Sequence, residues 1–129
     1  MAVTLNHTIV WCSDQGRSAA FLTDLLGLPA AKPFYHFLVV ELDNHVSLDF
    51  YQREGAVARQ HYAFLVDEAA FDAAFARIGA QGLTYWADPA QTRPGEINRN
   101  DGGRGLYFED PDGHLLEIIT RPYGSGADS

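Results

Sequence analysis

Two histidines and two carboxylates occupy matching places in the two halves of this sequence of 129 residues. His7 and His61 each lie at the start of a strand-like apolar stretch, and Asp49 and Glu117 each lie in a later strand-like stretch of the same half. Two imidazoles and one carboxylate form a facial ligand set that leaves positions open for a substrate. This set suits Fe(II) oxygen chemistry, although Mn, Ni, Zn or Co could also occupy it. The residue types therefore predict a metal site made by His7, His61 and Glu117.

Glu117 is the least expected of these residues, because it lies between two leucines and two isoleucines. A carboxylate among aliphatic side chains is costly unless it is paired, protonated or bound to a metal. Strand alternation places Glu117 on the same face as Leu115 and Ile119. Alternatives stay open at this point: Glu117 could face water on a half-buried strand, and each histidine could be a satisfied core residue.

The elements that must position these residues follow one pattern, strand–helix–strands, which occurs twice as a weak internal repeat. The first half is expected to contain a strand over 3–12, a helix after Ser13-Asp14 that ends at Gly27, and strands over 34–42 and 46–51. The second half is expected to contain a strand over 60–66, a helix capped by Asp67 that ends at Gly79 and Gly82, and strands over 83–86, 105–109 and 114–121. Module 1 therefore spans about 3–52 and module 2 about 60–121, with a polar linker at 53–59 and a frayed tail at 122–129.

Composition places the chain among globular proteins of one ordinary domain, with 47% hydrophobic and 20% charged residues. The net charge of −8 and the pI of about 4.8 argue against binding to nucleic acid or to anionic membranes. No apolar run is long enough to span a membrane, and the N-terminus lacks the pattern of a secretion signal. Cys12 is the one cysteine, which excludes an internal disulfide and fits a reducing compartment. We therefore expect a cytoplasmic protein.

The sequence resembles the vicinal oxygen chelate superfamily, the group of glyoxalases, bleomycin-resistance proteins and extradiol dioxygenases. The resemblance rests on Leu5-Asn6-His7, on Gln60-His61 followed by the Asp67-capped helix, and above all on the motif YFEDPDGHLLE, which ends at Glu117. It implies an α+β fold in which two βαβββ modules form a curved, eight-stranded half-open barrel, with helices on the outside, around one divalent metal. By position, His7, His61 and Glu117 match the metal ligands of the superfamily. The resemblance also implies a homodimer, in which a site can draw ligands from both subunits.

Three further residues are candidates for catalysis. Asp49 stands where some members of the superfamily have a fourth ligand, usually Glu or Gln. Because Asp is one methylene shorter, it could instead support the ligands from behind or act as a base. Arg99 is the residue nearest to a histidine that extradiol dioxygenases use in acid–base chemistry, and Tyr107 lies in the shared motif.

The surroundings of the site have two interpretations each. The polar segment 87–104 is either a mobile edge over a cavity or a solvated loop. If it is an edge, five of its side chains could face a polar substrate: Arg93, Glu96, Asn98, Arg99 and Arg104. Four aromatic residues could line a pocket for a flat substrate or simply pack the core: Trp11, Phe37, Tyr51 and Tyr107. The remaining histidines, which lack the placement of the ligand candidates, are expected to be structural or solvated: His36, His45 and His114.

Three functions fit these observations. The first is a non-haem Fe(II) dioxygenase. Its substrate would be a phenolic or enolisable small molecule that chelates the metal through neighbouring oxygens, and this class includes polycyclic aromatic molecules. The second is a glyoxalase I-like isomerase, lyase or thiol transferase, in which the metal is a Lewis acid and Asp49 or Glu117 moves a proton. The third is a metal-free drug-sequestering protein of the bleomycin-resistance kind, which would not need the His–His–Glu set. We predict a homodimer in which His7 of one subunit completes a site with His61 and Glu117 of the other.

Overall fold

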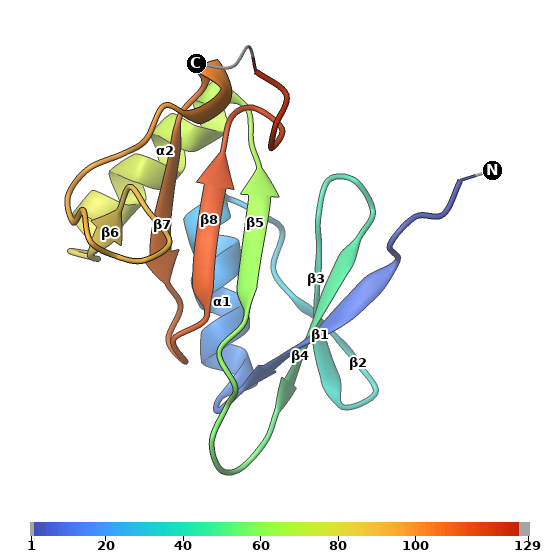
Figure 1. Ribbon diagram of the computed structural model, residues 1–129. Coiled ribbons are helices and arrows are strands. Elements are labelled where there is room, and N and C mark those ends of the chain that lie inside the picture. Colours follow the sequence, from blue (N-terminus) through green and yellow to red (C-terminus); the bar gives the residue numbers. More distant parts are fainter. Residues whose placement is uncertain (1, 127–129) are drawn as a thin grey trace. The chain divides into compact units, whose positions relative to one another are not determined.

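The computed structural model describes residues 2–126, and the chain divides into two compact units that meet in sequence between Ala58 and Arg59. Over the described residues, each unit contains one α-helix and one four-stranded mixed sheet (Figure 1). The element order in each unit is β–α–β–β–β. The prediction of an α+β fold built from two βαβββ modules is therefore confirmed.

Unit 1 contains the first helix and the first four strands of the chain. Its elements are β1 (His7–Cys12), α1 (Gln15–Leu26), β2 (Lys32–Phe34), β3 (Phe37–Glu41) and β4 (Ser47–Gln52). The strand order is β1-β4-β3-β2, in which β1 and β4 are parallel and the other pairs are antiparallel. Helix α1 packs against β3 and β4, and the face of the sheet that carries Val10, Val40 and Phe50 is buried in the core.

The ends of α1 follow from the local sequence. The Asp14 side chain accepts a hydrogen bond from the backbone N–H of Arg17 at 3.1 Å, which satisfies one of the donors left over at a helix N-terminus. Gly27 ends the helix in the left-handed region, with φ of 68°, and its N–H donates to the carbonyl of Thr23. Both helix limits were predicted from the sequence.

The single strand expected over 34–42 is wrong, because the structure has a hairpin there. Strands β2 and β3 pair antiparallel with Phe34 opposite Phe37, so the turn contains only Tyr35 and His36. Tyr35 adopts a φ of 52°, which tight hairpin turns require and which Gly or Asn usually provides. Because neither Gly nor Asn occupies this turn, the sequence pattern did not indicate it.

Unit 2 repeats the arrangement with a longer connection. Its elements are β5 (His61–Leu65), α2 (Glu68–Ala80), β6 (Tyr85–Trp86), a short 3-10 turn η1 (Asn100–Gly102), β7 (Gly105–Glu109) and β8 (Leu115–Ile119). The strand order is β5-β8-β7-β6, with β5 and β8 parallel. Helix α2 continues through Gly79, where the sequence suggested an end, because Ile78 is fully buried and keeps the last turn on the core. No helix within residues 2–126 is both long and apolar enough to cross a membrane.

Candidate metal centre

His61 and Glu117 form a contacting pair on the neighbouring parallel strands β5 and β8. The two residues are held in register, because His61 lies opposite Leu115 and Ala63 lies opposite Glu117. The His61 Nε2 atom lies 3.1 Å from the Glu117 Oε1 atom. On its other side, His61 Nδ1 lies 2.9 Å from the carbonyl oxygen of Leu115. Since a carbonyl only accepts hydrogen bonds, Nδ1 carries the proton, and Nε2 is the nitrogen left to act as a ligand.

Glu117 is buried, with 8% of its surface exposed, and Tyr107 supports it from the other neighbouring strand. Tyr107 lies opposite Glu117 in the antiparallel pair of β7 and β8, and its hydroxyl donates a hydrogen bond to the carboxylate. Burial, the charge of Glu117 and this bond raise the pKa of Tyr107, so the hydroxyl stays protonated at neutral pH. The Tyr107 ring also stacks with the His61 imidazole, with 5.9 Å between ring centroids. Tyr107 therefore contacts both members of the pair.

The chemistry of this pair fits a bound cation. With a proton on Nδ1, His61 turns Nε2 toward the Glu117 carboxylate, and the 3.1 Å contact is favourable when either a proton on Nε2 or another positive charge lies between the two atoms. A divalent metal provides that charge, and the outward bond from Nδ1 to a backbone carbonyl is the usual support of a metal-binding imidazole.

His7 in unit 1 has the same arrangement of its ring nitrogens. His7 Nδ1 lies 2.7 Å from the side-chain oxygen of Asn6, an acceptor, which leaves Nε2 available as a ligand. Asp49 lies on the same face, because β1 and β4 are parallel with His7 opposite Ser47 and Ile9 opposite Asp49. Both His7 and Asp49 line a cavity of about 570 Å³. In both units the histidine Nδ1 atom therefore faces a hydrogen-bond acceptor, and Nε2 is left available as a ligand.

Asp49 is a residue of low exposure whose carboxylate receives no hydrogen bond from the described protein. It is 9% exposed, and no hydrogen bond to its carboxylate is present among residues 2–126. No side-chain oxygen among the described residues is both fully buried and without a partner, so the Asp49 carboxylate oxygens are reached from the cavity that Asp49 lines. Its lone pairs are therefore open to the cavity, where they suit either a cation or a proton from a substrate.

Neither unit contains the whole predicted set. Within the described part of either unit, no three His, Cys, Asp or Glu side chains are grouped so that they could hold a metal. The structure brings His61, Glu117 and Tyr107 together in unit 2, and His7 and Asp49 in unit 1.

The segment 87–104 is an ordered structure rather than a plain connector. The Asp88 carboxylate accepts hydrogen bonds from the backbone N–H groups of Thr92 and Arg93 and from the Thr92 hydroxyl, and these bonds lower the pKa of Asp88. Asn98 is buried and donates to the carbonyl of Ala87 at 2.9 Å. Two isolated bridges join the segment to the strands on either side of it, Pro94 to Trp86 of β6 and Asn98 to Gly105 of β7. The segment is therefore fixed to the edge of the sheet that carries Glu117.

The charged residues of this segment are mostly engaged with the protein. Arg104, which would face a substrate if the segment were an edge over the cavity, instead pairs with Glu68 and Asp72 at the start of α2, at 2.7 and 2.8 Å. Arg93 pairs with Glu96 at 3.2 Å. Arg99 is exposed, and within the described chain its side chain takes part in no hydrogen bond or ion pair, so its catalytic role stays a prediction.

His114 has a positioning role that the sequence did not reveal. It is fully buried, as a structural histidine should be, and its Nδ1 atom accepts a hydrogen bond from the backbone N–H of Gln60 at 3.0 Å. The Asp110 carboxylate in turn accepts the N–H groups of Asp112 and His114. The turn before Glu117 therefore fixes the residue that precedes His61, an interaction that joins positions 54 residues apart.

A second network ties the start of β5 to the segment 87–104. Arg59 donates to Glu109 Oε2 at 2.8 Å and to the side-chain oxygen of Gln91 at 3.2 Å, and Gln91 donates to the same carboxylate oxygen at 2.9 Å. The bonds from Gln91 and Arg59 lower the pKa of Glu109. Glu109 shares the face of Glu117, but its charge is already neutralised by Arg59.

The fold agrees with the comparison to known sequences. The sequence model of the Glyoxalase/Bleomycin resistance protein/Dioxygenase superfamily matches residues 4–118, and the chain belongs to this superfamily. Members of the superfamily use divalent metals and are usually homodimers that act on small molecules.

Three relatives place the chain within the superfamily. The solved structure of oxidase ChaP-H1 is 63% identical, with a TM-score of 0.94 over 95% of this chain and 99% of that chain. The structure of oxidase ChaP-H2 is 61% identical, with a TM-score of 0.95 over 98% and 100% of the two chains. The glutathione transferase FosA of Serratia marcescens is 32% identical over 124 residues, which cover 92% of this chain and 81% of FosA. The chain is thus far more similar to two oxidases than to the thiol transferase.

Proposed function

We propose that this protein is a metal-dependent oxygenase, specifically a non-haem Fe(II) dioxygenase, acting on a phenolic or enolisable small molecule that offers neighbouring oxygens. The observation that carries the proposal is the His61–Glu117 pair, in which a fixed tautomer and a buried carboxylate converge on one point. The identity of 63% and 61% to two oxidases favours oxidation over the other reactions of the superfamily.

His7, His61 and Glu117 would hold the metal. Fe(II) bound there would supply a Lewis acid and the redox chemistry that a reaction between an organic molecule and O2 requires. The sequence predicts that His7 comes from one subunit of a homodimer and His61 with Glu117 from the other. Because each described unit holds only part of the ligand set, a complete site needs a unit 1 and a unit 2 together, either from one chain or from two.

The remaining residues would orient the ligands and move a proton. Tyr107 holds the Glu117 carboxylate through its hydroxyl and keeps that proton, because its pKa is raised. The Leu115 carbonyl fixes the His61 ring. Asp49, a buried carboxylate without a hydrogen-bond donor among residues 2–126, would accept the proton of a substrate hydroxyl.

Thiol transfer or isomerisation of the glyoxalase kind is the second candidate. The observation that favours it is the relation to the FosA glutathione transferase, at 32% identity over nearly the whole chain. In that reaction the same ligands would hold the metal as a Lewis acid, and no O2 would be consumed.

The test is an anaerobic reconstitution. Chelator-treated protein is loaded with Fe(II), Mn(II), Ni(II), Co(II) or Zn(II) in turn, and O2 uptake is measured with 2,3-dihydroxynaphthalene as a planar phenolic probe. We expect O2 uptake in the Fe(II) form and none in the Zn(II) form. If no metal form consumes O2 and the protein instead adds glutathione to fosfomycin, the dioxygenase proposal is wrong and the second candidate replaces it.

A further inference from the structure

The sheet face of unit 1 that carries His7 is divided into rows of side chains by the strand register. In the middle row, Ile9 lies opposite Asp49, Asp49 opposite Val39, and Val39 opposite Lys32. Residues opposite each other in a sheet place their side chains on the same face. Lys32 therefore lies in the same row as the buried carboxylate Asp49, on the edge strand β2.

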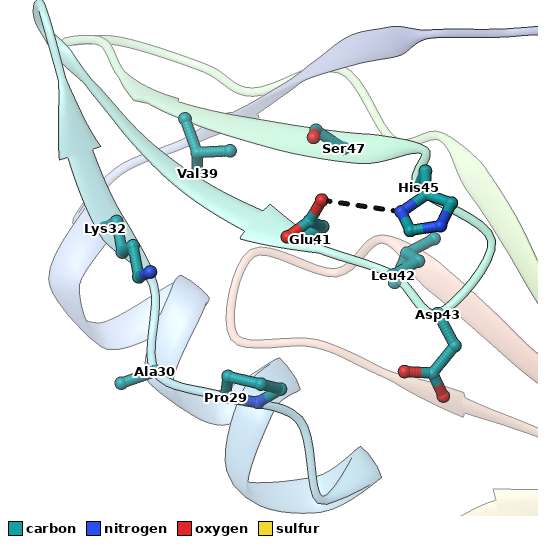
Figure 2. A pocket seen from close by; sticks show the side chains of 9 residues that line it. All are labelled: Pro29, Ala30, Lys32, Val39, Glu41, Leu42, Asp43, His45 and Ser47. Atoms are coloured by element: carbon teal, nitrogen blue, oxygen red, sulfur yellow. Dashed lines mark ion pairs between the residues drawn. The ribbon is translucent and has the colours of Figure 1, made fainter.

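Two cavities on this face meet at Lys32. The cavity of about 570 Å³ that contains His7 and Asp49 is lined by Lys32, Val39 and Ser47. The same three residues line a second cavity of about 460 Å³, which extends along the face to Glu41 and His45 (Figure 2). The second cavity therefore extends the surface next to His7 beyond Lys32.

Charge on this surface is uneven. Among the described residues that line either cavity, Lys32 is the one Lys or Arg, and the acidic ones are Glu41, Asp43 and Asp49. Glu41 is partnered by His45, with 3.9 Å between carboxylate and ring nitrogen (Figure 2). Over residues 2–126, Lys32 is in no ion pair. Within the two cavities an anionic ligand group is therefore attracted at Lys32 and repelled by the carboxylates, which would fix its orientation. Outside the cavities, Arg53 lies over the Trp11 ring, 5.6 Å from its centroid.

An aromatic row flanks the middle row on the same face. Trp11 stacks on Tyr51 with 5.1 Å between ring centroids and 23° between planes, and Phe37 contacts Tyr51 edge to face at 4.9 Å. Phe34, opposite Phe37 on β2, is 59% exposed and lines the larger cavity with Phe37. Exposed aromatic faces of this kind bind planar rings.

We propose that Lys32 binds the anionic oxygen of a planar aromatic substrate, a phenolate or carboxylate, whose rings lie against Phe34 and Phe37. Lys32 is then the residue that selects acidic aromatic molecules and sets their direction along the face. This inference rests on the proposed function for its choice of substrate, since it places an oxygen-bearing ring next to His7 and Asp49. The contact itself needs no metal, because a Lys ammonium attracts an anion without one.

The test compares an acidic and a neutral planar probe. The full-length protein is titrated at neutral pH, as purified and again after chelation, with 3-hydroxy-2-naphthoate and with neutral 2-naphthol, by fluorescence and calorimetry. For Lys32→Met we expect about tenfold weaker binding of the naphthoate, with 2-naphthol unchanged. Lys32→Arg should restore part of the naphthoate affinity. Phe34→Ala should weaken both probes.

Arg17→Met is the matched control, since it removes the same charge from an exposed position on α1 and leaves the cavity lining intact. Naphthoate binding that is unchanged in Lys32→Met, or equally weakened in Arg17→Met, would overturn the proposal. Because the chelated protein is titrated as well, the result does not depend on the metal ligands. If the Fe(II) form consumed no O2 but naphthoate binding still depended on Lys32, the dioxygenase proposal would be wrong and the proposed Lys32–anion contact would stand.

Discussion

The two units share one topology but hold their candidate ligands in different ways. In unit 2, Glu117 is 8% exposed, bonded to Tyr107 and placed against His61. In unit 1, the Asp49 carboxylate has no hydrogen-bond donor among the described residues, and it lies with His7 beside a cavity of about 570 Å³. Unit 2 therefore holds a preorganised pair of candidate ligands, whereas unit 1 presents a cavity that could bind a small molecule.

The two units also differ in the segment that connects their second and third strands. In unit 2, the segment 87–104 is fixed by two bridges and by the Arg59–Glu109–Gln91 network, and it adds protein next to β7. In unit 1, the strands β2 and β3 are joined by the two-residue turn Tyr35-His36, so no such segment follows. The two modules therefore differ in the connection between their second and third strands, which is long in unit 2 and only two residues in unit 1.

The largest effect should follow from removing the buried ligand of unit 2. We expect Glu117→Ala to reduce metal affinity by more than about 100-fold while the protein stays folded, because the carboxylate lies beside a ligand nitrogen and is not part of the apolar core. Metal content after dialysis and calorimetric titration would measure this. Glu109→Ala is the control, a carboxylate on the same face that is already paired with Arg59, and it should keep the metal. Equal metal content in wild type and Glu117→Ala would contradict the proposed site.

Asp49→Asn addresses the corresponding position of unit 1. We expect the variant to keep its metal and to lose about 10- to 100-fold in turnover, since an amide cannot accept a proton from the substrate. Metal titration and O2 uptake of the Fe(II) form would be measured together. A fall in metal affinity as steep as that of Glu117→Ala would instead make Asp49 a fourth ligand and favour the glyoxalase-like reaction.

Mixing subunits tests whether the two kinds of unit meet across a dimer. Inactive His7→Ala and inactive Glu117→Ala proteins are combined and allowed to exchange subunits. With shared sites, a mixed dimer has one site with both lesions and one with neither, so about a quarter of full activity should return at random reassortment. With each site inside one chain, every site keeps a lesion, and activity should stay at zero after verified exchange.

Tyr107→Phe should have the smallest effect, because it removes only the hydroxyl that orients Glu117. We expect a few-fold weaker metal binding and a loss of about 1 kcal/mol in stability at neutral pH. The matched control is Tyr85→Phe, since the Tyr85 hydroxyl makes a longer bond of 3.3 Å to the carbonyl of Gly95. If Tyr107→Phe and Tyr85→Phe had equal metal affinity and equal stability, the proposed role of Tyr107 in orienting Glu117 would be wrong.

The raised pKa of Tyr107 also gives this comparison a pH dependence. A group whose pKa is raised by folding favours the folded state while it is protonated. That contribution is complete below the ordinary tyrosine pKa of about 10 and is lost as the pH rises further. Chemical unfolding between neutral and strongly basic pH should therefore show wild type losing its advantage over Tyr107→Phe above about pH 10. A constant difference between the two proteins would contradict this.

The sequence by itself determined the local features of this protein. Asp14 and Asp67 mark helix starts because their side chains reach N–H groups only three residues away. The period of two placed Glu117 on one face with Leu115 and Ile119, and the repeated strand–helix–strands order followed from periodicity and turn residues. In unit 1, the separation of β2 from β3 was implied only by the family resemblance, because the turn between these strands carries no turn signal. These features depend on neighbours in the chain, so they could be predicted without a structure.

Only the tertiary structure decided how the candidate residues are held. The placement of Tyr107 opposite Glu117 depends on the register of β7 and β8, and the tautomer of His61 depends on the carbonyl of Leu115. Arg104 would face a substrate if the segment 87–104 were an edge over the cavity, yet it pairs with Glu68 and Asp72 of α2. Each of these contacts joins different elements of the chain. The physical reason is that strand register and ion pairing are set by packing between elements, which no local pattern of residues specifies.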